Sequence, residues 1–200
     1  MNLPPLILAS ASPRRAELLR EIVVRFQVMP AHAKEFQPEH LSPVESAMLN
    51  AYRKARLMAK KFPDFLVLGA DTEVCLGQRV FGKPKDRPHA ERMLAQLQGS
   101  EHQVITGVCL VHLRAHRQRT FADTTRVTFK SLGTDEIRFY LDKINPLDKA
   151  GAYAIQEHGE MIVEKVEGSH SNVIGLPVER LREELKSFEA RGGGAARDQT

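Results

Sequence analysis

The sequence contains little cysteine and no long hydrophobic run. Its two cysteines, Cys75 and Cys109, each lie inside an apolar, strand-like segment, which favours buried reduced thiols over a disulfide or a metal site. A membrane span needs about 18 or more consecutive apolar residues, and no such run occurs. The apolar segment at residues 6–9 follows no basic residue, which is not typical of a signal peptide. We therefore expect a cytoplasmic protein.

Several familiar active-site motifs are also missing. No Walker A or G-x-G-x-x-G pattern occurs, which argues against an ATPase P-loop and a Rossmann dinucleotide site. No G-x-S-x-G elbow is present, which argues against an α/β-hydrolase triad. The basic segment 112–119 has no interleaved aromatic residue, so nucleic-acid binding is a minor hypothesis. The formal net charge of +4 at pH 7 still favours anionic partners.

Local patterns predict an α/β fold. Apolar runs at 6–9 and 65–71 indicate strands, and a hairpin turn follows at 76–79. Helix-start signals occur around Ser12, Ser42 and Asp86, and a second strand pair is joined across 112–119. The remainder indicates a helix from Thr134, strands at 151–156 and 161–166, and a helix opened by Pro177. We expect one domain over residues 1–190, with a mixed twisted sheet and flanking helices, and a disordered tail over 191–200.

The first predicted helix begins with two cations, Arg14 and Arg15. The N-terminus is the positive end of the helix dipole, where acidic residues are favoured. In one interpretation, both arginines extend into solvent. In the other, they join Ser10 and the free N–H groups of the first turn in binding an anion with several oxygens. The residues alone leave both interpretations open.

Asp71 follows the apolar run 65–70, so we expect it where a buried strand ends, a usual place for ligand-facing groups in α/β sheets. Glu73 would point to the same side if the extended chain continues. These carboxylates could hold Mg²⁺ or act as a base, and Gly69-Ala70 should leave the approach to Asp71 open. The alternative is that Asp71 caps a turn.

Two lysines have similarly open interpretations. Lys54 lies at the border of the apolar stripe predicted for the helix after Ser42, where it either extends along the surface or reaches into a cleft. Lys83 lies in the Gly/Pro-framed turn "GKPKD", which fixes its backbone. Such a lysine could belong to a binding site or could equally be an ordinary surface residue.

A series of segments resembles the Maf family, once called septum-formation inhibitors: "SASPRR", "GADTEV", "GKPKD", "PLDKAGAYAIQ" and "GSHSNVIGLPVERL". They occur in the family's order and spacing from residue 6 to about 188. The resemblance implies a nucleoside triphosphate pyrophosphatase with two lobes around a central cleft, similar in architecture to inosine-triphosphate pyrophosphatases. It also implies a divalent cation, Mg²⁺ or Mn²⁺, and a nucleoside triphosphate substrate, with neither nucleic acid nor membrane as partner. A homodimer is compatible with it.

The segment "DKAGAYAIQ" resembles the dTTP/UTP branch, with modified pyrimidine nucleotides as further substrates. The 7-methyl-GTP branch typically has a cysteine before its Ala-Gly and a glutamate in place of Gln156. By resemblance, Asp71 is the catalytic proton acceptor. Arg14, Thr72 and Gln156 match specificity positions. The positions implied to contact phosphates or metal are Ser10, Arg15, Glu35, Lys54 and Lys83, and the metal would be held by Glu35 and Asp71.

Two residues depart from the family pattern. Glu73 stands where an apolar residue is usual, and Glu157 stands where a glycine is common. The competing hypothesis is a non-catalytic nucleotide-binding regulator of septum formation that uses the same pocket. Release of pyrophosphate from dTTP separates the two hypotheses, because a regulator would bind without turnover.

Overall fold

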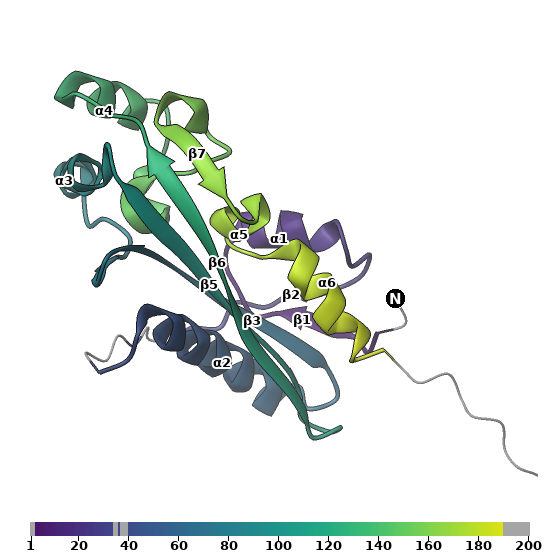
Figure 1. Ribbon diagram of the computed structural model, residues 1–200. Helices are drawn as coiled ribbons and strands as arrows, with labels where there is room; N and C mark the ends of the chain where they lie inside the picture. The colour runs from purple at the N-terminus through teal and green to yellow at the C-terminus, as the bar shows by residue number, and fades with distance from the viewer. Residues whose placement is uncertain (1–2, 34–35, 37–39, 190–200) are drawn as a thin grey trace, which may run out of the picture.

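A computed structural model describes residues 3–33, 36 and 40–189 (Figure 1). The predicted tail 191–200 and Glu35 lie outside these residues. The strands are β1 (Leu6–Leu8), β2 (Gln27–Val28), β3 (Leu66–Leu76), β4 (Arg79–Phe81), β5 (Glu101–His112), β6 (Arg117–Phe129) and β7 (Val163–Glu167). The helices are α1 (Pro13–Arg20), α2 (Pro43–Lys61), α3 (Arg87–Leu97), α4 (Thr134–Leu141), α5 (His170–Ile174) and α6 (Val178–Lys186). None of the helices described is long and apolar enough to cross a membrane.

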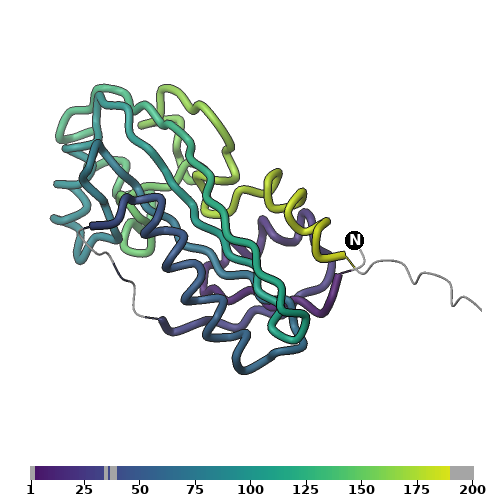
Figure 2. The backbone as a smooth tube through the Cα atoms, turned by 60° about the horizontal axis from the view of Figure 1, so that its bottom comes forward, coloured from purple at the N-terminus to yellow at the C-terminus, as the bar shows by residue number. Residues whose placement is uncertain are grey.

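The strands form a seven-stranded mixed sheet, as predicted, with the order β2-β1-β3-β5-β6-β7 and with β4 paired to β3. β1 runs parallel to β2 and β3, and the other pairs are antiparallel. The β5–β6 hairpin runs the length of the molecule, and the N-terminal segment lies at the same end as the end of α6 (Figure 2).

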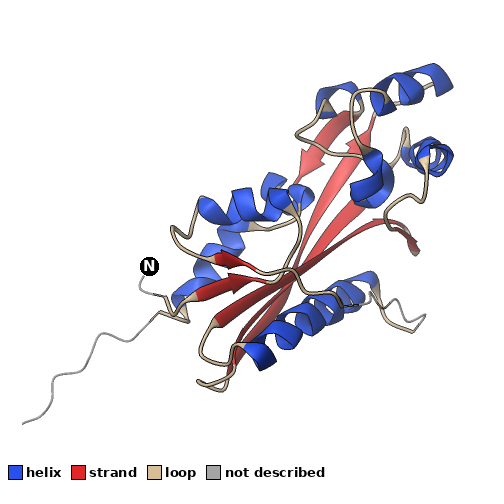
Figure 3. Cartoon of the chain, turned by 180° about the vertical axis from the view of Figure 1, so that it is seen from behind, coloured by secondary structure: helices blue, strands red, loops and turns tan. Residues whose placement is uncertain are grey.

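Side-chain alternation along the strands divides the core into two faces. On one face, Ile7 and Val67 pack against the alanine-rich side of α2. On the other face, Leu8 and Leu68 pack against α1 and α6. Further along that second face, Val74 and Val104 pack against α3 and α4. Figure 3 shows α2 alone on its side of the sheet, while the other helices form two groups on the opposite side.

One edge of β3 is interrupted. β1 pairs with residues 66–68 and β4 pairs with residues 74–76, so β3 has no strand neighbour on this edge at residues 69–73, within the part of the chain described. Asp71 lies in this gap. The expectation that β3 ends at Asp71 is wrong, because β5 pairs with β3 from Leu66 to Cys75 and continues the ladder past the apolar run. The strand that ends near this position is β1, whose last residue, Leu8, pairs with Leu68.

Two glycines let α2 approach the sheet closely. A Cβ atom on Gly69 would lie 2.3 Å from the Ala51 carbonyl oxygen, and one on Gly107 would lie 2.3 Å from the Ala47 carbonyl carbon. We expected Gly69 to leave the approach to Asp71 open. That expectation is wrong at Gly69, because α2 covers this residue. The close packing instead brings the polar residues of α2 within reach of β3.

The predicted helix starts are confirmed. Ser12 Oγ accepts a hydrogen bond from Arg15 N, Ser42 and Glu45 form a capping box, and Asp86 caps α3. Pro177 is the N-cap residue of α6, so this helix begins at Val178, one residue later than expected. β2 and α5 have few residues, and periodicity gave no signal for such short elements.

The strand expected at 151–156 is wrong. Ala150–Ala152 forms a 3₁₀ turn, in which Gly151 and Ala152 have φ angles of +70° and +65°. These left-handed conformations interrupt an extended chain. The strand expected at 161–166 begins later, at Val163, after a 3₁₀ turn at Gly159–Met161.

Both cysteines are buried free thiols, as predicted. Burial raises the pKa of Cys75 to about 12 and that of Cys109 to about 11. Neither thiol would be a reactive thiolate at neutral pH.

Candidate active site

A cavity of about 450 Å³ opens at the gap in the sheet. Every sequence-predicted site residue that the structure describes lines it: Ser10, Arg14, Arg15, Lys54, Asp71, Thr72, Lys83 and Gln156. Glu35 lies outside the described residues. Residues from five separate segments of the chain therefore meet at the interrupted edge of β3.

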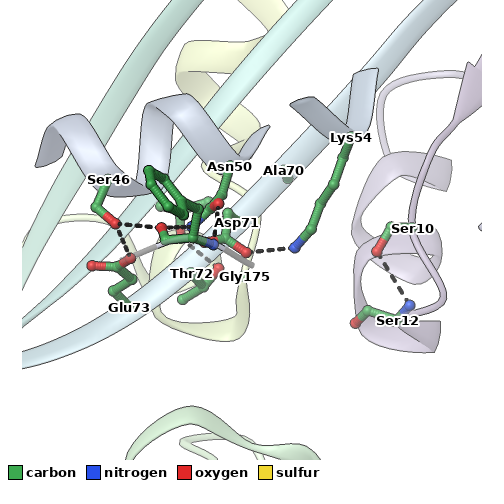
Figure 4. Close-up of polar contacts among 12 residues, drawn as sticks. Ser10, Ser12, Ser46, Asn50, Lys54, Ala70, Asp71, Thr72, Glu73 and Gly175 are labelled. Atoms are coloured by element: carbon green, nitrogen blue, oxygen red, sulfur yellow. Dashed lines mark hydrogen bonds and ion pairs between the residues drawn. The ribbon is translucent and has the colours of Figure 1, made fainter. Parts of the chain in front are cut away.

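Lys54 and Asp71 form a buried ion pair at the cavity wall (Figure 4). Lys54 Nζ lies 2.5 Å from Asp71 Oδ1, and the two side chains are 13% and 7% exposed. Of the two interpretations of Lys54, the structure thus shows the one in which it reaches the cleft. Because a buried charge without a partner is costly, each residue holds the other in place.

Glu73 faces α2 together with Asp71, as alternation along the strand predicts. Ser46 Oγ donates a hydrogen bond to Glu73 Oε1 at 2.9 Å, and both residues are buried. Asn50 lies between Ser46 and Lys54 on α2. Its Oδ1 accepts a hydrogen bond from Phe36 N, and its Nδ2 donates to the Phe36 carbonyl oxygen. Three polar residues spaced four apart thus lie along one side of α2, and Lys54 among them lines the cavity; the sequence analysis missed this pattern.

Arg15 lies along the open edge of β3. Its Nη1 donates to the carbonyl oxygen of Ala70 at 2.9 Å and to Ser10 Oγ at 3.3 Å. Its Nε donates to the carbonyl oxygen of Gly175 and its Nη2 to Thr72 Oγ1, both at 2.9 Å. The guanidinium therefore joins α1, β3 and the end of α5. It does not extend into solvent.

Thr72 points to the face opposite Asp71 and belongs to a chain of hydrogen bonds. Its Oγ1 accepts from Arg15 and lies 3.0 Å from Thr106 Oγ1. Thr106 donates its own proton to the carbonyl oxygen of Asn172 at 3.1 Å. Thr72 must then be the donor to Thr106, which leaves Thr72 only an acceptor lone pair for a ligand.

The first turn of α1 offers fewer backbone donors than the sequence suggested. Ser12 N donates to Ser10 Oγ at 3.2 Å, Arg15 N donates to Ser12 Oγ, and Pro13 has no N–H. Among these described residues, the N–H of Arg14 remains for an anion. An anion at this helix start would depend mainly on arginine side chains.

Arg14 forms an ion pair with a residue that the sequence analysis missed, Asp148. Arg14 Nη1 lies 2.8 Å from Asp148 Oδ2, and Nη2 donates to the Asp148 carbonyl oxygen at 3.2 Å. Partial burial alone would raise the pKa of Asp148, but hydrogen bonds from Lys149 and Arg14 hold it below its usual value. No local pattern marks Asp148, because its partner is 134 residues away.

Lys149 is buried beneath this pair. Its Nζ donates to the Asn145 carbonyl oxygen at 2.8 Å and to Asp148 Oδ1 at 2.9 Å. It also lies 3.2 Å from Glu157 Oε2. Gln156, the residue before Glu157, is exposed and lines the cavity. Glu157, which departs from the family pattern, therefore anchors the turn that carries Gln156.

The donor set fits a cation that enters with its substrate. Asp71 and Glu73 supply hard oxygen ligands at the cavity, while no group of three or more His, Cys, Asp or Glu residues suited to a metal occurs in the described ranges. Mg²⁺ commonly binds through one or two carboxylates and takes its other ligands from substrate phosphates and water. The residues present fit such a cation.

The chain is similar to several known proteins. The family described as Maf-like protein matches residues 5–188. The dTTP/UTP pyrophosphatase of Carboxydothermus hydrogenoformans is 44% identical over 181 residues, which cover 90% of this chain and 97% of that protein. The dTTP/UTP pyrophosphatase of Pelotomaculum thermopropionicum is 44% identical over 183 residues, which cover 92% of this chain and 96% of that protein. The structure of the Staphylococcus aureus Ham1 protein aligns over 92% of this chain and 98% of its own, with a TM-score of 0.49 and 16% identity. The chain belongs to the Maf family.

Proposed function

We propose that this protein hydrolyses dTTP and UTP to the nucleoside monophosphate and pyrophosphate. Relatives that carry the name dTTP/UTP pyrophosphatase are 44% identical over nine-tenths of the chain. The observation that carries the proposal is the buried Lys54–Asp71 pair, which lies in one cavity with Arg14, Lys83 and Gln156. That combination suits a polyanion with a polar base.

The cations of the cavity would bind the triphosphate. Its nearly four negative charges require several positive partners in a partly enclosed site. Arg14 of α1 and Lys83 of the loop after β4 both line the cavity, and the planar fork of arginine suits phosphate oxygens. Arg15 would act mainly by fixing the edge of β3, because its guanidinium already donates to Ala70, Thr72 and Gly175.

Asp71 would act as the general base. A carboxylate oxygen accepts a proton from the attacking water, while the water oxygen forms a bond to the α-phosphorus. The bridging bond between the α- and β-phosphates breaks, and pyrophosphate leaves. Lys54, 2.5 Å from Asp71 Oδ1, orients the carboxylate and leaves Oδ2 to face the water.

A divalent cation, when bound, would neutralise phosphate charge as it develops in the transition state. Asp71 and Glu73 are the described residues that would hold it, with Glu35 as a further ligand by family resemblance. Ser46 would keep the Glu73 carboxylate in position through its hydrogen bond.

An activity panel tests this proposal. Pyrophosphate release is measured with Mg²⁺ for dTTP, UTP, CTP, 7-methyl-GTP and 5-methyl-UTP. We expect turnover of dTTP, UTP and 5-methyl-UTP that is lost in Asp71→Asn. Nucleotide binding without turnover in the wild type would instead support the non-catalytic regulator.

A further inference from the structure

A basic depression lies next to the cavity. It has a volume of about 520 Å³ and is formed by β4, the loop after it and one side of α3. The residues that carry its chemistry are Arg79, Phe81, Lys83, Lys85, His89 and Arg92. Lys83 and the preceding residues 80–82 line both hollows, so the depression continues the cavity past Lys83. Neither the family resemblance nor the proposed mechanism gives it a role.

The charge of the depression is not balanced. Arg79, Lys83, Lys85 and Arg92 all line it, no carboxylate lines it, and none of the four belongs to an ion pair within the ranges that the structure describes. The other side of α3 is different. There Arg87 pairs with Asp142 at 2.7 Å, and Glu91 lies 3.5 Å from Arg138. Like charges gathered without a counter-charge are unfavourable unless an anion joins them.

The donors are also oriented. The Arg79 guanidinium lies 5.2 Å from the centre of the Phe81 ring, and such stacking leaves the N–H groups at its rim available. His89 Nδ1 accepts a hydrogen bond from Lys85 N at 3.2 Å, so the neutral ring carries its proton on Nε2 as a donor. His89 and Arg92, three residues apart, lie on one side of α3.

We propose that this depression binds a condensed phosphate chain. Several separated cations suit an anion that carries charge on more than one phosphate. Phe81, the aromatic residue at the depression, is 2% exposed, so its ring is covered and a base could not stack on it. The source of this phosphate chain rests on the proposed function. The chain is either pyrophosphate that leaves the cavity past Lys83, or the outer phosphates of a substrate longer than a triphosphate.

Calorimetry with inorganic pyrophosphate and tripolyphosphate tests the site directly. The variant is Arg79→Gln/Arg92→Gln, which leaves Lys83 in place. The control is Arg114→Gln/Arg119→Gln, which removes the same charge from ion pairs that do not involve α3. We expect the variant to raise the Kd of both anions at least about fivefold, and the control to change it less than about twofold. Unchanged binding in the variant, or an equal loss in the control, would overturn the proposal. No turnover is needed, so this result is independent of the pyrophosphatase activity.

Kinetics then distinguish the two sources. If the depression takes the leaving product, the variant raises the inhibition constant of pyrophosphate and leaves the ratio of kcat/KM for uridine tetraphosphate to that for UTP unchanged. If it takes the outer phosphates of a longer substrate, that ratio falls. If neither quantity moves, the depression has no part in the reaction and the proposal fails.

Discussion

Arg14 and Asp148 connect the two sides of the cavity, with Arg14 Nη1 2.8 Å from Asp148 Oδ2. Arg14 lies in the first turn of α1, and Asp148 precedes the turn that leads to Gln156. The carboxylate of Asp148 supplies the negative charge that the first turn of α1 lacks. One partly exposed ion pair thus links the start of α1 to the segment that leads to Gln156.

Replacing the two helix-start arginines should have different consequences for stability. Arg14→Ala loses a partly exposed ion pair and relieves a cation–dipole conflict, so the free energy of unfolding should change by less than about 0.5 kcal/mol. Arg15→Ala leaves the carbonyl oxygens of Ala70 and Gly175 without their donor, which should cost about 2–4 kcal/mol. Urea denaturation measures both. Equal losses would show that Arg15 does not support the edge of β3. For Arg14→Ala, we also expect a raised KM for dTTP.

Asp71→Asn should retain the fold and lower kcat by roughly 10²–10⁴, the range for loss of a general base. The amide can still accept a hydrogen bond from Lys54, but the buried lysine loses its counter-charge, so we also expect a lower free energy of unfolding. Pyrophosphate release and circular dichroism measure the two effects. Asp135→Asn, an exposed residue of α4, provides the charge-matched control. Turnover like that of the wild type in folded Asp71→Asn would remove Asp71 from the mechanism.

Gln156 should select uracil and thymine. These bases present an N3–H donor beside the O4 acceptor, which an amide matches, while cytosine presents an unprotonated N3 and an amino group. Once a bound base covers the exposed Gln156 amide, an unpaired polar group there costs about 1–3 kcal/mol. We therefore expect kcat/KM for dTTP and UTP to exceed that for CTP at least roughly tenfold. Gln156→Glu should reduce this preference, because a carboxylate cannot donate to O4. A Glu variant with the same ranking of nucleotides would contradict this role.

Glu157 should act on selectivity through Gln156. Without its contact at 3.2 Å to Lys149, the turn that carries Gln156 loses an anchor. We expect Glu157→Gly to raise KM for UTP and to lower the UTP/CTP preference about threefold or more, with kcat nearly unchanged. Glu157→Asp should restore part of the preference. Glu160→Gly, an exposed residue of the same segment, is the control. An equal loss of kcat/KM for UTP and CTP would mean that Glu157 only stabilises the fold.

His102 should make the protein sensitive to acid. Burial lowers its pKa from 6.5 to about 4, and its Nε2 lies 2.9 Å from the Tyr153 hydroxyl. Between these pH values, the unfolded chain binds a proton that the folded protein does not bind. The free energy of unfolding therefore falls as the pH falls through this window, by up to about 3 kcal/mol. His102→Gln should remove this part of the pH dependence, as urea denaturation from pH 4.5 to 7.5 would show. The same slope in both proteins would contradict the assignment.

Local signals in the sequence sufficed for the features that act over a few residues. The Ser42–Glu45 capping box begins α2, and the alternation of β3 puts Asp71 and Glu73 on one side. These follow from backbone geometry within one turn or two strand residues. The order and spacing of the family motifs predicted the cavity residues, because those segments converge there.

Only the tertiary structure decided what each charged residue contacts. Arg14 and Arg15 are adjacent and have the same local pattern, yet one pairs with Asp148 and the other with backbone carbonyls along an open strand edge. The sequence suggested that Gly69 leaves the approach to Asp71 open, whereas α2 covers Gly69 in the fold. An ion pair or a close helix–sheet contact depends on which distant segments the topology brings together, and neighbouring residues carry no information about that.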